Sequence, residues 1–186
     1  MTEPKTLTKL ARAYTFAAEK HTGQFRKGEA REPYINHPCD VAYNVARIRP
    51  DDVNLICAAV LHDTVEDTDA EYDDILEHFG KDVADLVAEV TDNKALPKAE
   101  RKQAQVDSAP HKSERAKILK LCDKASNLEA MAYSPPTNWD LDRRKTYLEW
   151  GLKVAAGLKG ADAAADRHFD AAAELCAEKL GIRVAI

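Results

Sequence analysis

The stretch Cys57-Ala58-Ala59-Val60-Leu61-His62-Asp63-Thr64-Val65-Glu66-Asp67 joins an apolar segment directly to four ionisable side chains. Ionisable groups that follow a buried segment cost free energy unless something pairs them. At helical spacing, His62 and Glu66 share one face, and Asp63 and Asp67 share the adjacent one. Imidazole and carboxylate donors suit a divalent cation such as Mn, Fe or Zn. The stretch therefore predicts a metal site, and the alternative is an acidic helix end with solvated charges.

Two residues elsewhere in the chain carry the same kinds of side chain. His37 stands in Pro33-Tyr34-Ile35-Asn36-His37-Pro38, and Asp123 stands in Leu119-Lys120-Leu121-Cys122-Asp123-Lys124. Taken singly, a histidine before proline is commonly a turn or cap residue, and an aspartate beside a lysine is commonly a surface ion pair. Together with His62-Asp63 they supply two neutral imidazoles and two carboxylates, which leaves coordination positions for water and substrate.

Apolar residues recur at helical spacing along most of the chain, and no segment alternates in the manner of a strand. We expect helices over residues 7–21, from Pro38 onward, 51–61, 72–79, 83–90, 99–109, 118–128, 140–158 and 161–180, with an ordered loop over 24–37. Asp69 is the expected N-cap of the 72–79 helix, and Gly80 is expected to end it. The sequence predicts an all-α protein of about eight to ten helices, with a single domain over residues 1–186 and a core at about 5–180.

The composition is that of a globular protein, with 45% apolar residues, 32% charged residues and a formal net charge of −5. A protein that grips a nucleic-acid backbone normally carries a basic surplus, so a nucleic-acid polymer is not an expected partner. The longest apolar run, Leu55–Leu61, is far shorter than a bilayer-spanning helix, which takes about 20 residues. Residues 1–9 lack the apolar core of a signal peptide. We expect a cytoplasmic protein without a membrane partner, and no feature of the sequence indicates an oligomeric state.

The cysteines lie far apart in the sequence, and no two of them form a CxxC pair. They are Cys39, Cys57, Cys122 and Cys176, and three of the four lie within apolar stretches. Buried, reduced thiols are therefore the expected state, which indicates a reducing compartment.

Longer phrases around these residues carry a resemblance to a known family. The phrases are His21–Lys27, Pro33–Pro38, Leu61–Thr68, Glu89–Asp92 and Lys120–Leu128. They resemble the hydrolase domain of RelA/SpoT proteins, a branch of the HD-domain phosphohydrolase superfamily, and most nearly its stand-alone small alarmone hydrolases of the Mesh type. The resemblance covers residues from about 5 to 180 and implies a single HD-type helical bundle. Cys122 and Ala125-Ser126 depart from many relatives, but they flank the expected ligand and do not replace it.

The resemblance also implies roles for individual residues. His37, His62, Asp63 and Asp123 would hold one Mn²⁺ per chain, and Glu66 and Asp67 match the catalytic Glu-Asp pair. Seven further residues match substrate contacts of the family. Arg26 and Lys27 would meet the nucleotide, with Arg26 stacked on the base, and Tyr34 and Asn127 would line the base and ribose. Near the phosphates would lie Lys98, Arg143 and Tyr147. Each of these also has an ordinary interpretation: a solvated loop for Arg26-Lys27, a core aromatic for Tyr147, and a local backbone contact for Asn127.

The expected function is hydrolysis of guanosine 3′,5′-bis(diphosphate), or its pentaphosphate, to GDP or GTP and pyrophosphate. No synthetase domain follows, so the resemblance implies an enzyme that degrades the alarmone without making it. Three alternatives stay open: a phosphatase for another ribose-phosphorylated nucleotide, a non-catalytic nucleotide-binding sensor of the same fold, and a structural helical protein.

Overall fold

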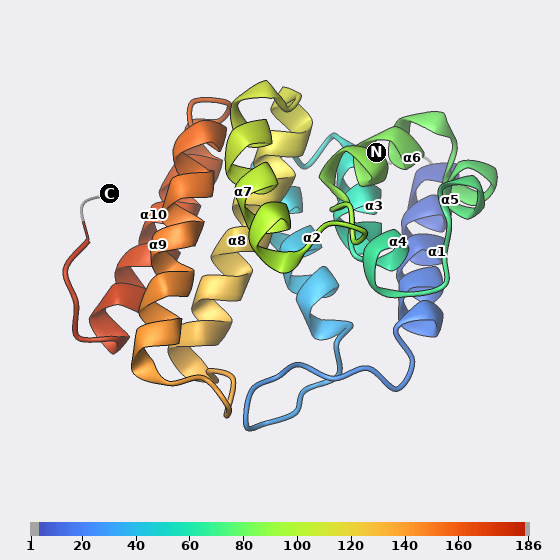
Figure 1. Ribbon diagram of the computed structural model, residues 1–186. Coiled ribbons are helices and arrows are strands. Elements are labelled where there is room, and N and C mark those ends of the chain that lie inside the picture. Colours follow the sequence, from blue (N-terminus) through green and yellow to red (C-terminus); the bar gives the residue numbers. More distant parts are fainter. Residues whose placement is uncertain (1–3, 185–186) are drawn as a thin grey trace. The chain divides into compact units, whose positions relative to one another are not determined.

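The computed structural model describes residues 4–184 and is built from helices (Figure 1). Among those residues the backbone forms ten α-helices, one short 3₁₀ helix and no strand, only isolated β-bridges such as that between Gly28 and Pro136. In chain order the helices are α1 (Pro4–Lys20), α2 (Asn36–Ile48), α3 (Val53–Leu61), α4 (Thr64–Asp67), α5 (Tyr72–Phe79), α6 (Lys81–Val90), α7 (Lys98–Ser108), η1 (Ala109–His111), α8 (Glu114–Tyr133), α9 (Leu141–Leu158) and α10 (Ala163–Lys179). The predicted all-α class is confirmed.

The described chain divides into two compact units. The N-terminal unit comprises the residues up to Gln24 together with Pro33–Asn93, and it contains α1 to α6. The C-terminal unit comprises Phe25–Glu32 together with the residues from Lys94 onward, and it contains α7 to α10. The loop Phe25–Glu32 therefore belongs to the C-terminal unit, although in sequence it lies between α1 and α2.

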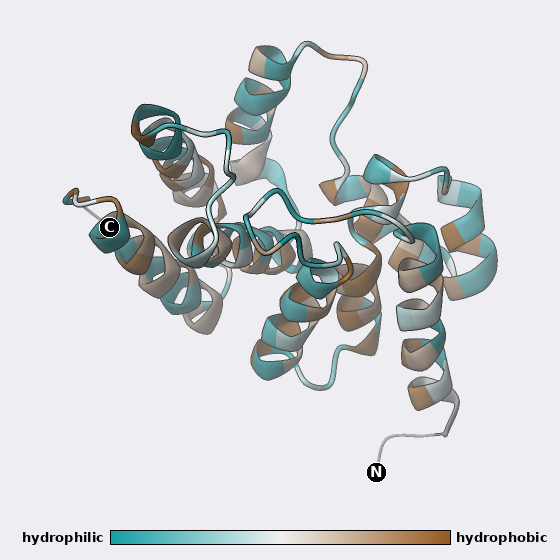
Figure 2. Ribbon diagram, turned by 90° about the horizontal axis from the view of Figure 1, so that it is seen from below, coloured by the Kyte–Doolittle hydropathy of each residue, from teal (hydrophilic) through white to brown (hydrophobic). Residues whose placement is uncertain are grey.

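Helix α3 is the centre of the N-terminal unit. Its residues Leu55–Leu61 are all buried, and α1, α2 and α6 pack against it. A helix that is apolar on every side is stable only when other elements surround it, which explains why this stretch lacks a polar face. Figure 2 shows the contrast with the other helices, many of which carry both hydrophobic and hydrophilic residues. The buried α3 gives His62, the next residue, a rigid support.

Helix α8 has the corresponding role in the C-terminal unit, where α9 and α10 pack against it. Its middle, Ile118–Ser126, is buried without interruption, although it includes Lys120, Asp123 and Lys124. Buried charges are costly unless they are paired, and they occur preferentially where a protein acts. The middle of α8 is therefore a candidate functional segment on burial alone.

Two local predictions for the N-terminal unit are wrong. Asp69 does not cap the following helix: the N-cap of α5 is Glu71, which forms a capping box with Asp74. Asp69 instead accepts a hydrogen bond from Lys20 at 2.9 Å. Leu7, expected on the buried face of α1, is 58% exposed. The capping box satisfies backbone N–H groups at both ends of the first turn, which Asp69 by itself does not do.

The cysteines follow the expectation. Cys57, Cys122 and Cys176 are buried, Cys39 is half-buried, and all four are free thiols. Burial raises the pKa of both Cys57 and Cys176 to about 11. Because the thiolate is the reactive form, both groups should react slowly with a disulfide reagent at about pH 8, and all four thiols should react once urea unfolds the chain. Rapid native-state labelling of Cys57 or Cys176, located by mass spectrometry, would contradict this.

The same shifts predict a loss of stability in alkali. The folded pKa of about 11 lies above the reference value of 9.0 for Cys57 and for Cys176. The neutral thiol is thus favoured by folding, so its stabilisation is present below pH 9 and is lost as pH rises toward 11. Urea unfolding should give a lower free energy at about pH 10.5 than at about pH 8. The double variant Cys57→Ala/Cys176→Ala should show a smaller drop, and an equal drop would contradict the prediction.

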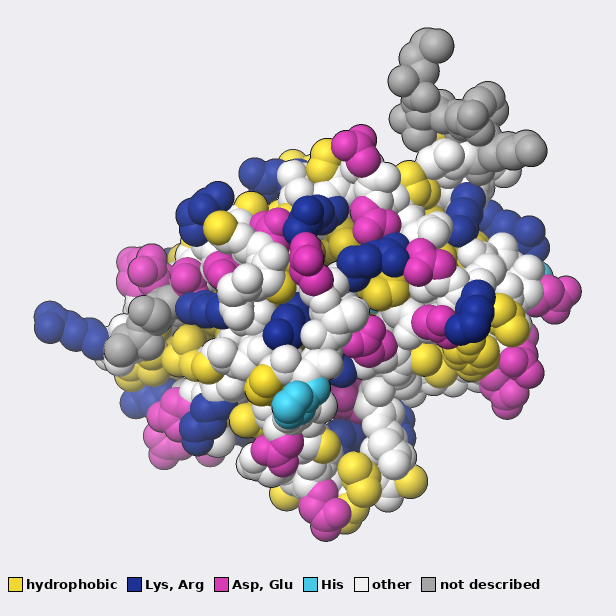
Figure 3. Space-filling model, turned by 90° about the horizontal axis from the view of Figure 1, so that it is seen from above, with side chains coloured by type: hydrophobic (Ala, Val, Ile, Leu, Met, Phe, Trp, Pro, Cys, Tyr) yellow, Lys and Arg dark blue, Asp and Glu magenta, His cyan; other side chains and the backbone are white. Residues whose placement is uncertain are grey.

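In the part of the chain that the structure describes, no helix combines the length and apolar character needed to cross a bilayer. On the face drawn in Figure 3, Lys and Arg side chains are intermixed with Asp and Glu side chains. Intermixed charges of both signs are typical of a solvated surface, whereas a nucleic-acid polymer is usually held by a continuous basic stripe.

Candidate active site

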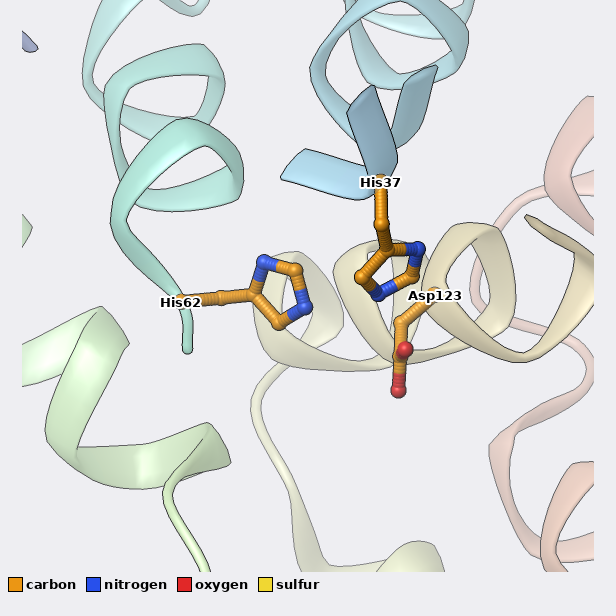
Figure 4. A group of neighbouring side chains, drawn as sticks. All are labelled: His37, His62 and Asp123. Atoms are coloured by element: carbon orange, nitrogen blue, oxygen red, sulfur yellow. The ribbon is translucent and has the colours of Figure 1, made fainter. Parts of the chain in front are cut away.

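His37 and His62 face each other inside the N-terminal unit. His37 lies in the first turn of α2, and His62 directly follows the last residue of α3 (Figure 4). The two helices pack together, and the imidazole rings meet edge to face, with centroids 5.2 Å apart and planes at 70°. Both side chains are buried, with 4% and 3% exposure. The packing of α2 on α3 therefore brings together two histidines that are far apart in the sequence.

Asp63 supplies a carboxylate to this pair. Its Oδ2 atom lies 3.2 Å from His62 Nε2 and 3.6 Å from His37 Nε2. The hydroxyl of Tyr34 donates a hydrogen bond to the same oxygen at 2.7 Å. Three predicted site residues, two from the segment 33–38 and one next to Asp63 itself, thus converge on one carboxylate oxygen.

His62 is oriented in the way a metal ligand requires. Its Nδ1 atom lies 2.8 Å from the carbonyl oxygen of Ala59. A carbonyl only accepts, so Nδ1 carries a proton, and Nε2 is the ring nitrogen left to ligate a metal. A hydrogen bond that fixes the tautomer through the other ring nitrogen is the usual support of a metal-binding histidine. The donor set of two imidazoles and a carboxylate fits a divalent transition metal.

The catalytic candidates Glu66 and Asp67 lie in α4, a separate helical turn. The expected helix over 51–61 ends at Leu61, as α3 does, and the helical spacing assumed for His62–Asp67 is interrupted before α4 begins at Thr64. The Thr64 hydroxyl bonds back across this turn by donating to Leu61 O at 2.6 Å. His62 and Asp63 keep right-handed helical backbone angles within the turn.

Both candidates are held by neighbours within the unit. Glu66 Oε2 accepts a hydrogen bond from the backbone N–H of Asp92 at 3.1 Å. Asp67 Oδ2 lies 3.4 Å from the Tyr34 hydroxyl, and its carbonyl accepts from the Gln24 side chain at 2.9 Å. Asp67 is exposed and Glu66 is half-buried. The pair is therefore positioned by contacts from three other segments, and Tyr34 connects it to Asp63.

Asp123 lies in the buried middle of α8, in the C-terminal unit, and is drawn in Figure 4. Its Oδ2 atom lies 3.3 Å from Lys124 Nζ and 3.8 Å from Lys120 Nζ. Its Oδ1 atom accepts a hydrogen bond from Asn127 at 2.7 Å. Like His37 and His62, Asp123 is buried and offers a metal-ligating atom. The ordinary interpretation of Asp123 as a surface ion pair is wrong, because the pairing occurs in the core.

The loop Phe25–Glu32 carries Arg26 and Lys27 and is fixed within the C-terminal unit. Arg26 donates from Nη2 to Asn127 Oδ1 at 3.1 Å, which joins two predicted substrate contacts. The backbone N–H of Thr137 donates to the Lys27 carbonyl at 3.4 Å. The loop also forms a bridge between Gly28 and Pro136. The local interpretation of Asn127 holds as well, since its amide also bonds the backbone oxygen of Asp123 at 3.1 Å.

Gly28 permits this docking, which gives a testable prediction. A Cβ atom at Gly28 would collide with the hydroxyl and the carbonyl oxygen of Ser134. Gly28→Ala should displace the loop, destabilise the protein by about 1–3 kcal/mol and weaken nucleotide binding through Arg26. The matched control is Gly151→Ala, where the new Cβ meets Leu128 at an ordinary 3.9 Å. Thermal unfolding and nucleotide titration check both variants, and equal behaviour of the two would contradict the prediction.

The three predicted phosphate contacts lie on two helices of the C-terminal unit. Lys98 begins α7, and Arg143 and Tyr147 lie four residues apart on α9. The Arg143 guanidinium lies 4.5 Å from the centroid of the Trp139 ring, and the Tyr147 ring lies 5.3 Å from it. Both Tyr147 and Arg143 are therefore held by a tryptophan, and Tyr147 is half-buried, which is less than its interpretation as a core aromatic implied.

Several residues near these sites escaped the sequence-based prediction. They are Gln24, Asp92, Lys102, Lys120, Lys124, Trp139 and Trp150. The sequence carried weak signals for some of them: Lys102 stands four residues after Lys98, and Trp150 stands three residues after Tyr147, so each pair shares a helix face. The contact of Asp92 with Glu66 had no local signal, because it joins residues 26 positions apart.

Comparison with known proteins agrees with this arrangement. A family model described as the HD domain matches residues 13–148. The chain therefore belongs to the HD-domain family. Within that family it is 48% identical over 152 residues to MESH1 of Mus musculus, which covers 81% of this chain and 85% of the relative. It is 44% identical over 159 residues to MESH1 of Xenopus tropicalis, which covers 85% of this chain and 89% of the relative. It belongs with these MESH1 proteins, and the resemblance drawn from the sequence is confirmed.

Both relatives are named guanosine-3′,5′-bis(diphosphate) 3′-pyrophosphohydrolases. A solved structure, of a metazoan ortholog of SpoT that hydrolyzes ppGpp, superposes with a TM-score of 0.84 at 40% identity. The matched part makes up 88% of this chain and 93% of the chain in that structure. The bifunctional (p)ppGpp synthase/hydrolase SpoT of Escherichia coli is 36% identical over 158 residues, but these make up only 21% of that protein.

Proposed function

We propose that this chain is a (p)ppGpp 3′-pyrophosphohydrolase, which hydrolyses guanosine 3′,5′-bis(diphosphate) to GDP and pyrophosphate, and the pentaphosphate to GTP and pyrophosphate. The observation that carries the proposal is the convergence of two imidazole Nε2 atoms on the Asp63 carboxylate, with His62 locked in the ligating tautomer. The substrate is proposed from the MESH1 relatives, which are named as guanosine-3′,5′-bis(diphosphate) 3′-pyrophosphohydrolases.

The ligand set proposed for the cofactor is His37, His62, Asp63 and Asp123, with one Mn²⁺ per chain. The buried imidazoles and the hydrogen-bonded carboxylates support this choice, because such donors suit Mn²⁺, Fe²⁺ or Zn²⁺. An ion held by these residues would supply a water of lowered pKa and would stabilise negative charge on phosphate. We further propose that residues 1–186 act as one HD-type domain, since the family match extends over parts of both units.

The proton transfers of the reaction are proposed to be carried out by side chains of this chain. Hydrolysis forms a bond between the water oxygen and the phosphorus attached to the ribose 3′ oxygen, and it breaks the 3′ O–P bond. The water loses a proton, and the leaving 3′ oxygen gains one. Glu66 and Asp67 are the groups proposed to move these protons. Asp92 orients Glu66, and Tyr34 holds Asp67 beside Asp63.

The substrate contacts are proposed by the same reasoning. Arg26 stacks on the guanine, Lys27 lies beside it, and Tyr34 and Asn127 line the base and ribose. The phosphates are met by Lys98, Arg143 and Tyr147. An arginine plane stacks on aromatic bases and lysine supplies donors to phosphate oxygens. A small nucleotide is therefore the proposed partner, and a cytoplasmic location is proposed because the buried cysteines are free thiols.

The experiment that tests the function is a nucleotide panel with metal titration, read by separate assays for pyrophosphate and orthophosphate. The metal-loaded protein should release pyrophosphate from ppGpp and pppGpp in amounts equal to the GDP or GTP formed. Orthophosphate release from another ribose-phosphorylated nucleotide at a higher kcat/KM would replace the proposal with the phosphatase. Nucleotide binding without turnover, in protein confirmed to contain metal, would replace it with the sensor.

A further inference from the structure

The C-terminal unit holds cations and aromatic rings that the proposed ligand set and catalytic pair do not use. Lys102 Nζ lies 4.5 Å from the ring centroid of Trp150 and 5.4 Å from that of Tyr147. Lys124 Nζ lies 4.6 Å from the Trp150 centroid. The indole N–H of Trp150 donates to the carbonyl oxygen of Lys102 at 3.1 Å. We call these four residues the cation–aromatic cluster, and within it α9 holds the lysine of α7 in place.

Within this cluster Lys124 is paired with Asp123, whereas Lys102 forms no ion pair with an acid of the described chain. Within residues 4–184, no carboxylate forms an ion pair with Lys98, Lys102 or Arg143. Burial lowers the pKa of Lys102, and the positive charges of Lys98, Lys124 and Arg143 lower it further. Aromatic faces attract an ammonium but do not neutralise it. Lys102 is half-buried, and neighbouring cations that repel one another are stabilised when an anion binds among them.

The cluster connects directly to a proposed metal ligand. Lys124 Nζ, which faces the Trp150 ring, also lies 3.3 Å from Asp123 Oδ2. Because Asp123 belongs to the proposed ligand set, the phosphate that reacts is expected beside this carboxylate. Lys102 Nζ and Lys124 Nζ lie at 4.5 Å and 4.6 Å from the same Trp150 ring centroid. A phosphate attached to the reacting one would therefore come within the reach of Lys102.

We propose that Lys102 binds the outer phosphate of the 3′-diphosphate, so that the cation–aromatic cluster selects a diphosphate over a monophosphate. This inference rests on the proposed function and names a specificity-determining residue for the same site. The ammonium of Lys102 donates to phosphate oxygens, while Trp150 and Tyr147 hold its stem and limit its rotamers. The competing role is purely structural, in which the same contacts only fasten α7 to α9.

Kinetics on two substrates separates these roles. The substrates are guanosine 5′-diphosphate carrying a 3′-diphosphate or a 3′-monophosphate, and the variants are Lys102→Met, Lys102→Arg and the exposed control Lys153→Met of α9. Lys102→Met should lower kcat/KM for the 3′-diphosphate about tenfold or more, as expected for a lost charge-assisted hydrogen bond. For the 3′-monophosphate the decrease should stay below about threefold, and Lys102→Arg should retain most of the activity. Equal decreases for both substrates, or none, would overturn the inference.

A binding measurement keeps the inference apart from the proposed function. Pyrophosphate and orthophosphate are titrated calorimetrically into the full chain, in buffer without added metal, and circular dichroism verifies that each variant is folded. The wild type should bind pyrophosphate more tightly than orthophosphate, and Lys102→Met should remove that preference while Lys153→Met keeps it. If the wild type releases no pyrophosphate from ppGpp, the proposed function fails, and this titration still decides the role of Lys102. Equal pyrophosphate binding by wild type and Lys102→Met, or no binding by the wild type, would overturn it.

Discussion

Replacing Glu66 with glutamine should lower kcat for pyrophosphate release from ppGpp by about 10²- to 10⁴-fold, the range for loss of a positioned general acid or base. Glutamine keeps the size of the side chain and an oxygen that can accept from the Asp92 N–H, so the local contact of 3.1 Å is retained. What it removes is the ability to take up or release a proton. Asp67→Asn should have a similar effect, because Asp67 is the other member of the pair. KM and metal content should change little in both variants, since neither residue is in the proposed ligand set.

Glu77→Gln is the matched control for this experiment. Glu77 is an exposed residue of α5 in the same unit, and it is remote in role from the proposed pair. Its replacement should leave kcat and KM unchanged. Turnover should be read by steady-state pyrophosphate release, with nucleotide affinity measured separately by calorimetry. A Glu66→Gln enzyme that turns over at the wild-type rate would remove Glu66 from the proposed mechanism, and weakened binding with unchanged kcat would assign it to substrate binding instead.

The His62→Ala variant should lose the bound metal and, as a consequence, the hydrolytic activity. The imidazole is one of two that meet the Asp63 carboxylate, and its tautomer is set by Ala59. Even supporting residues around metal ligands contribute about 10- to 100-fold to metal affinity, so loss of a ligand itself should weaken binding by at least about 100-fold. Elemental analysis after dialysis should give close to one metal per chain for the wild type and a small fraction of that for the variant.

His111→Ala is the control, because His111 is an exposed histidine of η1. It should keep both the metal and the activity. Chelator treatment of the wild type should reproduce the inactivity of His62→Ala, and added Mn²⁺ should restore the wild type but restore the variant only at much higher concentrations. A His62→Ala protein with full metal content would show that the ion is held elsewhere. Circular dichroism distinguishes loss of metal from loss of the fold.

The sequence by itself determined the kinds of chemistry available and the local helices. The apolar run Leu55–Leu61 predicts a buried helix, because its hydrophobicity on all sides leaves no face for water, and α3 is the centre of its unit. The polar phrase that follows predicts imidazole and carboxylate donors, because ionisable groups next to a buried segment require partners. These inferences rest on neighbours in the chain, for which spacing is informative.

Where local spacing was ambiguous, the prediction failed. Asp69 is of a preferred N-cap type, but α5 begins only at Tyr72, and its N-cap is Glu71, which pairs with Asp74, while Asp69 pairs with Lys20. The break between α3 and α4 depends on the Thr64 hydroxyl bonding back to Leu61. A serine or threonine hydroxyl can bond the backbone of the preceding turn both inside a helix and where a helix ends, so a periodic pattern alone does not reveal such a turn.

Only the tertiary structure decided which residues meet across the chain. The edge-to-face contact of His37 with His62 needs the packing of α2 on α3, and the Glu66 contact with Asp92 needs the end of α6 beside α4. Lys102 was identified as a candidate site residue only through its contact with Trp150, which lies 48 positions away in the sequence. The physical reason is that hydrogen bonds, ring contacts and desolvation act over a few ångströms in space, whereas the sequence records distance only along the chain.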